Sequence, residues 1–179
     1  MYYSVNPKYH KDASFKIDSI VHAAAKKEAE LWGTENKAWK TCNELRTQQS
    51  YEKYLRLYPK GAHMKQANKI LIDMAVARDF SGTHGTMPAL DKDYYTRGSV
   101  STITVTNETS YTMTLLYSGD KESARLVISA RGTESIRLPN GDYRISARVD
   151  ASNVIPYVGE EALTGGRYSA SYYISTTRY

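Results

Sequence analysis

The spacing of apolar residues changes near residue 98 of the chain. Before this point, apolar side chains recur every three or four residues, which is the spacing along one face of an α-helix. After it, they alternate with polar residues in short segments separated by turn-forming residues, as in β-strands. The pattern predicts an α+β protein with a small helical bundle over residues 1–80, a linker over 81–98, and an antiparallel β-sandwich of six to seven strands over 99–179.

Four helices are expected in the first part, each with one apolar face. The expected first helix, over about 12–32, places on one face Ile17, Val21, Ala24, Glu28 and Leu31. The second carries Ala38, Trp39, Cys42 and Leu45, and the third carries Tyr51, Tyr54, Leu55 and Tyr58. In the fourth, over about 62–80, the expected buried face holds Ala67, Ile70, Leu71, Met74 and Ala75.

Residues 51–63, with the sequence YEKYLRLYPKGAH, predict a turn between the third and fourth helices. Pro59 disfavours helical geometry at Tyr58, and Gly61 is expected to adopt the left-handed conformation that ends a helix. The short connection predicts an antiparallel helix hairpin, with His63 capping or packing its turn.

Two interpretations fit Tyr54 and Tyr58. As scaffold residues, they lie between the two helices of the hairpin, near Ala67 and Leu71, and truncating them is costly. As binding residues, they are exposed, and truncating them leaves the stability nearly unchanged. We expect the scaffold role.

The same segment resembles a tetratricopeptide-type helix-hairpin repeat. The resemblance covers about residues 35–75 and rests on Trp39 and on the run YLRLYPKGAHMKQANKIL at 54–71. It implies a packing and protein-interaction element. Because a solenoid needs about three repeats and only one clear copy is present, a small bundle of three or four helices is expected instead.

Seven segments of the second half are predicted to be strands. They are STITVTN, TMTLLY, RLVIS, ESIRL, DYRISARV, NVIPYVG and RYSASYYIS. Turn-forming sequences separate them, and PNGD is the strongest because Asn-Gly suits a tight hairpin turn. Pro156 should place its strand at a sheet edge or a bulge.

This half is similar to a C-terminal β-sandwich module of uncharacterised proteins from Bacteroidetes-type bacteria. The shared features are an Asn-x-Thr turn, a Tyr-Ser-Gly turn, a Leu-Pro-x-Gly-x-Tyr hairpin and a terminal Gly-Gly-x-Tyr strand, in that order. The resemblance implies the sandwich fold and a bacterial origin, and it implies no activity.

The basic excess lies in the helical part. Residues 1–98 hold 16 Lys and Arg against 11 Asp and Glu, and residues 99–179 hold 8 of each. Lys and Glu are interspersed along the chain, which argues against nucleic-acid binding. No apolar run approaches the roughly 20 residues that span a bilayer. The first residues lack the apolar stretch of a secretory signal, and whether Met1 is the native start stays open.

No catalytic, cofactor or metal site follows from residue spacing. The four histidines are His10, His22, His63 and His84, and no pair has the spacing of metal ligands on one helix face. Cys42, the only cysteine, lies on an apolar face and is expected to be a buried structural thiol. Glu160 and Glu161 are expected in a solvated loop, and in a strand they would point to opposite faces.

Tyrosine is abundant, with 16 residues against 2 Phe and 2 Trp. A tyrosine suits a half-buried position, because its ring packs on one side while its hydroxyl meets solvent or a partner. On the last expected strand, Tyr168 and Tyr172 share one face with Ile174, and Tyr173 lies on the other. These tyrosines either pack across strands, or Tyr168, Tyr172 and Tyr173 form an aromatic binding surface for a glycan or a protein.

These observations favour a non-catalytic protein-interaction or structural module of a bacterium, with no cofactor. The alternatives are a carbohydrate-binding sandwich that uses exposed tyrosines, and an enzyme without a recognised motif. The cytoplasm fits as a compartment, and so does the cell envelope if an N-terminal signal was removed.

Overall fold

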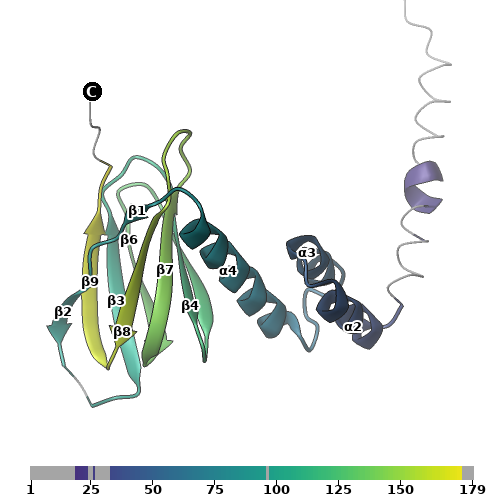
Figure 1. Cartoon of the computed structure of the whole chain (residues 1–179), viewed down its shortest axis with the longest axis horizontal. Coiled ribbons are helices and arrows are strands. Elements are labelled where there is room, and N and C mark those ends of the chain that lie inside the picture. The colour runs from purple at the N-terminus through teal and green to yellow at the C-terminus, as the bar shows by residue number, and fades with distance from the viewer. Residues whose placement is uncertain (1–18, 24–25, 27–32, 96, 175–179) are drawn as a thin grey trace, which may run out of the picture. The chain divides into compact units, whose positions relative to one another are not determined.

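Helices come first along the chain and strands follow (Figure 1), as the apolar spacing predicts. The α+β class is therefore confirmed. The computed structural model describes residues 19–23, 26, 33–95 and 97–174. The chain divides into two units, Met1–Gly61 and Ala62–Tyr179.

This division falls earlier in the chain than the sequence pattern predicts. Helix α4 (Met64–Ser81) belongs to the unit that holds the sheets. The predicted linker over 81–98 contains two short strands, β1 (Gly85–Thr86) and β2 (Asp91–Tyr94). The sheet-facing side of α4 carries aspartates, which an apolar pattern does not register, and β1 and β2 are too short and too polar to show alternation.

In the first unit, helix α2 (Glu35–Leu45) packs against helix α3 (Gln48–Leu57). Thr47 begins α3 with a capping box: its hydroxyl accepts from the Ser50 amide at 3.2 Å, and the Ser50 hydroxyl accepts from the Thr47 amide at 3.3 Å. Leu45 is 56% exposed, so its predicted place on the buried face of α2 is wrong. The cause is that α2 ends there, since Arg46 takes the left-handed conformation with φ 50°.

The expected first helix is described only in part. Residues 19–23 are helical, and Val21 among them is exposed. The other residues of its predicted apolar face, Ile17, Ala24, Glu28 and Leu31, lie outside the described residues, as does His10.

The core of the first unit is aromatic. The ring of Trp39 on α2 meets Tyr51 edge-on at 5.9 Å between centroids and Tyr54 at 5.2 Å. The Tyr54 hydroxyl donates to Glu35 Oε1 at 2.6 Å. Tyr58 stacks on Tyr54 at 5.5 Å, and its hydroxyl donates to the carbonyl of Gly33 at 2.9 Å. These contacts join the end of α3 to the start of α2.

The chain turns after α3 without the predicted left-handed glycine. The Gly61 amide donates to the Tyr58 carbonyl at 3.0 Å, and φ of Gly61 is not positive. Glycine is required here for space instead: a Cβ atom at Gly61 would lie 2.6 Å from both the Tyr54 hydroxyl and Glu35 Oε1. The prediction of a left-handed Gly61 is therefore wrong, although the position still excludes a side chain.

We expect Gly61→Ala to lower the free energy of unfolding of the first unit by about 1–3 kcal/mol, as other overpacking substitutions do. The added methyl group must push apart the Tyr54 hydroxyl and the Glu35 carboxylate. Denaturant unfolding followed by tryptophan fluorescence measures the loss, because Trp39 lies against Tyr54. The neighbouring exposed-site change Lys60→Ala is the control. Equal midpoints for the two variants would contradict the crowding.

The second unit is a sandwich of two sheets (Figure 1). Sheet A has the strand order β1-β8-β7-β4-β5, and sheet B has the order β2-β9-β3-β6. The longer strands are β3 (Val100–Asn107), β4 (Met113–Gly119), β5 (Ser123–Ile128), β6 (Thr133–Pro139), β7 (Gly141–Val149), β8 (Tyr157–Leu163) and β9 (Gly166–Tyr172). The described residues thus hold these seven strands at nearly the predicted places, plus β1 and β2.

Both sheets are mixed, which corrects the purely antiparallel prediction. Strand β1 runs parallel to β8, and β3 runs parallel to β9. The remaining neighbours are antiparallel. Alternation predicts that a segment is a strand but not which strand it pairs with, and here the last strand lies beside the first long one.

Strand β8 begins after Pro156 instead of containing it. Glu160 and Glu161 therefore lie in β8, which corrects the loop prediction. Glu160 forms an ion pair with Arg144 at 3.9 Å, and Glu161 accepts from the Leu90 amide at 3.0 Å. The two carboxylates contact different neighbours, because adjacent side chains in a strand point to opposite faces of the sheet.

Side chains from the two sheets meet in one apolar core. Its buried members are Met87, Leu90, Ile103, Val105, Met113, Leu115, Tyr117, Leu126, Ile128, Leu138, Tyr143, Ile145, Ala147, Leu163 and Tyr168. Asn107 ends β3 as a buried polar residue, and its side-chain amide donates to the carbonyls of Tyr111 and Ser129 at 2.8 and 2.9 Å. Asn107 Oδ1 also accepts hydrogen bonds from the Thr109 amide and hydroxyl. The buried Asn107 side chain therefore holds the predicted Asn-x-Thr turn in place.

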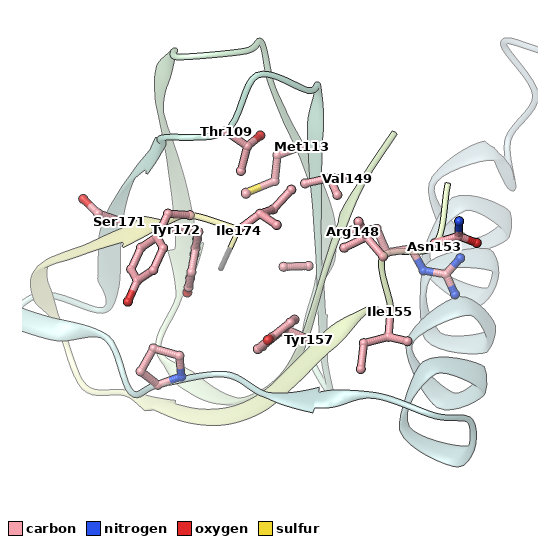
Figure 2. A pocket seen from close by; sticks show the side chains of 14 residues that line it. Thr109, Met113, Arg148, Val149, Asn153, Ile155, Tyr157, Ser171, Tyr172 and Ile174 are labelled. Carbon is pink, nitrogen blue, oxygen red and sulfur yellow. The ribbon is translucent and has the colours of Figure 1, made fainter. Parts of the chain in front are cut away.

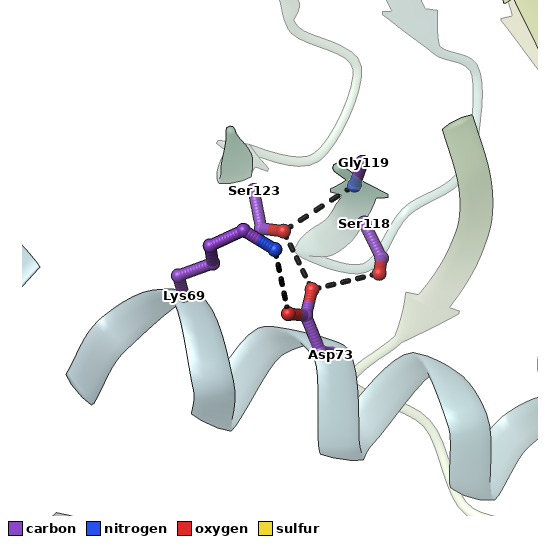
Figure 3. A network of polar contacts seen from close by, with 5 residues as sticks. All are labelled: Lys69, Asp73, Ser118, Gly119 and Ser123. Atoms are coloured by element: carbon purple, nitrogen blue, oxygen red, sulfur yellow. Dashed lines mark hydrogen bonds and ion pairs between the residues drawn. The ribbon is translucent and has the colours of Figure 1, made fainter. Parts of the chain in front are cut away.

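Helix α4 lies on the outer face of sheet A and is attached to it by hydrogen bonds. Figure 3 shows Asp73 accepting from the hydroxyls of Ser118 and Ser123 at 2.7 and 2.5 Å, while Lys69 pairs with its other oxygen at 2.8 Å. Asp79 is buried and accepts from the Ser146 hydroxyl and from Arg148 Nε, the latter at 2.7 Å.

The buried face of α4 was predicted to hold Ala67, Ile70, Leu71, Met74 and Ala75. Ala67 is buried, but the other four are half-buried.

Candidate binding site

A pocket of about 430 Å³ opens at one end of the sandwich, between the two sheets (Figure 2). Sheet A supplies Met113, Ala147, Val149 and Tyr157, and the end of β9 supplies Ser171 and Tyr172 with the following Tyr173 and Ile174. Loops supply Pro88, Thr109, Asn153, Val154 and Ile155, and Arg148 completes the lining.

The local fold explains why the pocket exists. Residues of β7 alternate, so that Ala147 and Val149 face the interior while Ser146 and Arg148 face α4. Ala147 is small and adds little bulk at this end of the sandwich. The loop after β7 turns at Asn153, whose φ of 66° is left-handed and suits asparagine, and it carries Ile155 to the pocket mouth.

The lining is mainly apolar, and its polar groups are hydroxyls, one side-chain amide and the guanidinium of Arg148. It contains no His, Cys, Asp or Glu. Its one charged side chain, Arg148, forms an ion pair with the buried Asp79. Burial and the neighbouring Arg78 lower the pKa of Arg148, but the guanidinium stays charged. The pocket therefore suits an uncharged, largely apolar group.

The mouth of the pocket exposes large apolar side chains. Ile155, Tyr157, Tyr173 and Ile174 line the pocket and are among the exposed large hydrophobic residues of the described chain. A group of exposed apolar residues around a concave site marks a place where a ligand or a partner binds.

The three tyrosines of the predicted binding surface have three different environments. Tyr168 is in the core, and its hydroxyl accepts from the Thr164 amide at 2.9 Å. The ring of Tyr172 lines the pocket, while Tyr173 is 72% exposed at the mouth. Tyr172 and Tyr173 therefore reach the pocket, and Tyr168 does not line it.

The hydroxyl of Tyr172 is buried and has no hydrogen-bond partner within the described residues. Burial, with a contribution from the charge of Glu161, raises the pKa of Tyr172 to about 12. Tyr172 thus presents its ring to the pocket as a neutral phenol over the whole physiological pH range.

The predicted hairpin residues are distributed between the two units. Tyr54 is fully buried, and Tyr58, Pro59, Gly61 and His63 follow it around the turn. His63 occupies the position before α4, but its side chain makes no capping hydrogen bond there. The pairing of α3 with α4 as a hairpin involves both units and stays a prediction.

Within the described residues, Cys42 and the histidines His22, His63 and His84 form no metal-binding group. Cys42 is buried and donates from Sγ to the Ser50 carbonyl at 3.2 Å. Burial raises the pKa of this thiol, which therefore stays protonated and unreactive. Within the described part of the chain, no group of three or more His, Cys, Asp or Glu is placed to hold a metal ion.

Among the helices of the described residues, none is both long and apolar enough to cross a membrane.

Sequence reasoning missed most of the pocket. Met113, Ala147, Val149 and Ile155 come from segments that are distant in sequence, and only strand pairing brings them together. The sequence feature that could have indicated the pocket is the apolar pair Val154–Ile155, which lies in a segment otherwise rich in turn-forming residues.

No family model and no curated protein matches the chain. Among solved structures, part of the chain is similar to a DUF3823 family protein from Parabacteroides merdae. The similarity has a TM-score of 0.30 and 16% sequence identity, and it covers 41% of this chain and 45% of that chain. A likeness at this TM-score carries no argument about function, and the tetratricopeptide resemblance stays a prediction.

Proposed function

We propose that the chain is a non-catalytic binding module whose second unit accepts an apolar side chain of a protein partner in the pocket between its sheets. The observation that carries this proposal is the apolar lining of a 430 Å³ pocket with exposed apolar residues at its mouth. Pockets of a few hundred Å³ with such a lining are usual ligand sites.

The chemistry of the lining favours binding over catalysis. General acid–base and nucleophilic catalysis need a titratable or nucleophilic side chain within reach of the bound group. The hydroxyls of the lining would need an adjacent general base to act as nucleophiles, and the lining holds no His, Asp, Glu or Lys. Its one charged group, the guanidinium of Arg148, already pairs with Asp79.

The same lining favours a protein segment over a sugar. A sugar needs hydrogen-bond partners for most of its hydroxyls, and the pocket walls are formed largely by Met113, Ala147, Val149, Ile155 and aromatic rings. An apolar side chain inserted from a partner needs no such partners and gains about 25 cal/mol for each Å² of apolar surface buried.

Selection from a displayed library of random peptides tests the proposal with the full chain as bait. We expect enriched peptides with a recurrent Leu, Ile, Met or Phe at one position. Ile155→Asp should lower the affinity of the chain for a synthetic copy of the best peptide by about tenfold, because the substitution places a charge at the apolar mouth of the pocket.

Val127→Asp is the matched control, since Val127 on β5 is 48% exposed and Ile155 is 45% exposed. It should leave peptide affinity unchanged. Peptides without an apolar anchor, or equal weakening by both substitutions, would contradict the proposal. Binding of a panel of neutral oligosaccharides that Ile155→Asp abolishes would assign the pocket to a glycan instead.

A further inference from the structure

The last residues of β9 form a sheet edge that no described strand covers. Strand β2 pairs with β9 only from Arg167 to Ser169, because β2 begins at Asp91, which lies opposite Ser169. On its other side, β9 follows β3 as far as Tyr172. Beyond Ser169, β9 therefore has a strand neighbour on one side only within the described residues.

The backbone groups of Ser171 point toward this open edge. The carbonyl of Tyr172 accepts from the Glu108 amide at 2.8 Å, so the backbone of Tyr172 faces β3. Because the backbone groups of successive strand residues point to opposite neighbours, those of Ser169 and Ser171 face the other way. Ser169 meets β2 there. Ser171 has no backbone partner among the described residues, and Tyr173 comes next in the same alternation.

This edge lacks the features that usually keep other chains from pairing with an exposed strand. Charged residues and proline are the common ones. Strand β6, the opposite edge of sheet B, carries Glu134, Arg137 and Pro139. Strand β2 has three charged residues among its four. Residues 170–174, with the sequence ASYYI, contain neither a charged residue nor proline.

The open edge also borders the pocket. Ser171, Tyr172, Tyr173 and Ile174 all belong to the lining (Figure 2). Side chains that lie opposite each other on antiparallel neighbours point to the same face of the sheet. A residue placed opposite Tyr172 therefore directs its side chain to the face on which the Tyr172 ring lines the pocket.

We infer that the partner segment binds as an extended β-strand, added to sheet B beside the end of β9 and antiparallel to it, as β2 is. This inference rests on the proposed function, in which the pocket takes an apolar side chain. The residues of the segment opposite Ser171 and Tyr173 exchange backbone hydrogen bonds with them, and the residue between places its side chain in the pocket. A helical segment fits this edge poorly, because its own backbone groups are already paired.

A scan of amide-to-ester replacements in the synthetic peptide tests the added strand. Each replacement removes one backbone N–H group and keeps the side chains. At the residues directly before and after the apolar anchor, we expect affinity for the full chain to fall about three- to tenfold, because these N–H groups point to β9. At the anchor itself, the N–H group points away from β9, and the change should stay below about twofold.

Ser171→Pro tests the same edge from the protein side. Proline removes the N–H group of Ser171, which does not serve the pairing with β3, so the β3–β9 ladder keeps its hydrogen bonds. We expect this variant to keep the wild-type circular dichroism spectrum and to bind the peptide at least about tenfold more weakly, since strand addition loses a hydrogen bond and meets the proline ring.

Ser135→Pro is the matched control, because Ser135 is also an exposed edge serine. The Asn107 amide donates to the Gly132 carbonyl at 2.8 Å, and by alternation the N–H group of Ser135 points away from β3 to the open side of β6. This variant should change peptide affinity by less than about twofold. If Ser171→Pro alters the spectrum, the ester scan decides alone, since it leaves the protein unchanged.

The added strand is overturned by ester effects that do not alternate between the anchor and its neighbours, or by equal weakening from the two proline variants. If Ile155→Asp still weakens the same peptide, the pocket proposal stands without the strand. A selection without an apolar anchor overturns the pocket and the strand together. Self-association of the full chain that Ser171→Pro abolishes, measured by sedimentation without peptide, would assign the edge to a second copy instead of a partner protein.

Discussion

Asp79→Ala is expected to lower the free energy of unfolding of the second unit by roughly 3 kcal/mol. Asp79 is buried at the α4–sheet contact and forms an ion pair with Arg148 as well as a hydrogen bond from Ser146. Removing one partner of a buried ion pair typically costs about 3–5 kcal/mol, and we place this case at the lower end because 43% of the Arg148 side chain meets solvent.

Denaturant unfolding followed by far-ultraviolet circular dichroism measures this loss in the β-rich unit. Asp73→Ala is the matched control, because Asp73 lies on the same side of α4 but is one-third exposed. It should cost about 1 kcal/mol. A double-mutant cycle with Arg148→Met should give a coupling energy of about 1–3 kcal/mol for the Asp79–Arg148 pair. Equal losses for Asp79→Ala and Asp73→Ala would contradict the buried-pair account.

This ion pair also explains why sequence reasoning missed the contact of α4 with sheet A. Apolar spacing assigned the helix to a bundle, because Ala67, Leu71 and Met74 recur at helical intervals. The side of α4 that contacts sheet A is anchored by Asp73 and Asp79. An aspartate is counted as a solvent residue in any apolar pattern, and only its partners on distant strands reveal that it is buried.

The strands themselves could be predicted from the sequence, because the alternation of apolar and polar residues is a local property. The alternation of STITVTN, for example, places Ile103 and Val105 in the core, as observed. Pairing is not local, however. The parallel contact of β3 with β9 joins segments more than 60 residues apart, and the end of β9 forms one wall of the pocket. That wall leaves no signature in a single segment.

The turn at Gly61 shows a different limit. Gly61 was predicted to be required for a left-handed backbone conformation, which it does not adopt. The actual cause of the requirement is the approach of Tyr54 and Glu35 from elsewhere in the unit. A sequence shows that glycine is present and does not distinguish a requirement for positive φ from a requirement for space.

Tyr54→Ala is expected to have the largest effect on the first unit, with a loss of roughly 3–5 kcal/mol in its free energy of unfolding. The Tyr54 side chain is fully buried, meets the rings of Trp39 and Tyr58, and donates to Glu35. Truncation leaves a cavity beside Trp39 and removes the hydrogen bond to Glu35. Because small units have total stabilities of about 5–15 kcal/mol, such a loss brings this one close to unfolding.

Tryptophan fluorescence separates the two interpretations of this residue. If Tyr54 is scaffold, Tyr54→Ala should lower the unfolding midpoint strongly, and Tyr54→Phe should cost only about 1 kcal/mol, since it keeps the ring and loses one hydrogen bond. Tyr58→Ala should be intermediate, because Tyr58 is half-buried. Leu45→Ala, a 56% exposed position on α2, is the control and should stay within about 1 kcal/mol of wild type. A native-like midpoint for Tyr54→Ala would reject the scaffold role and make the aromatic cluster a binding surface, because a ring that can be removed without loss does not hold α2 against α3.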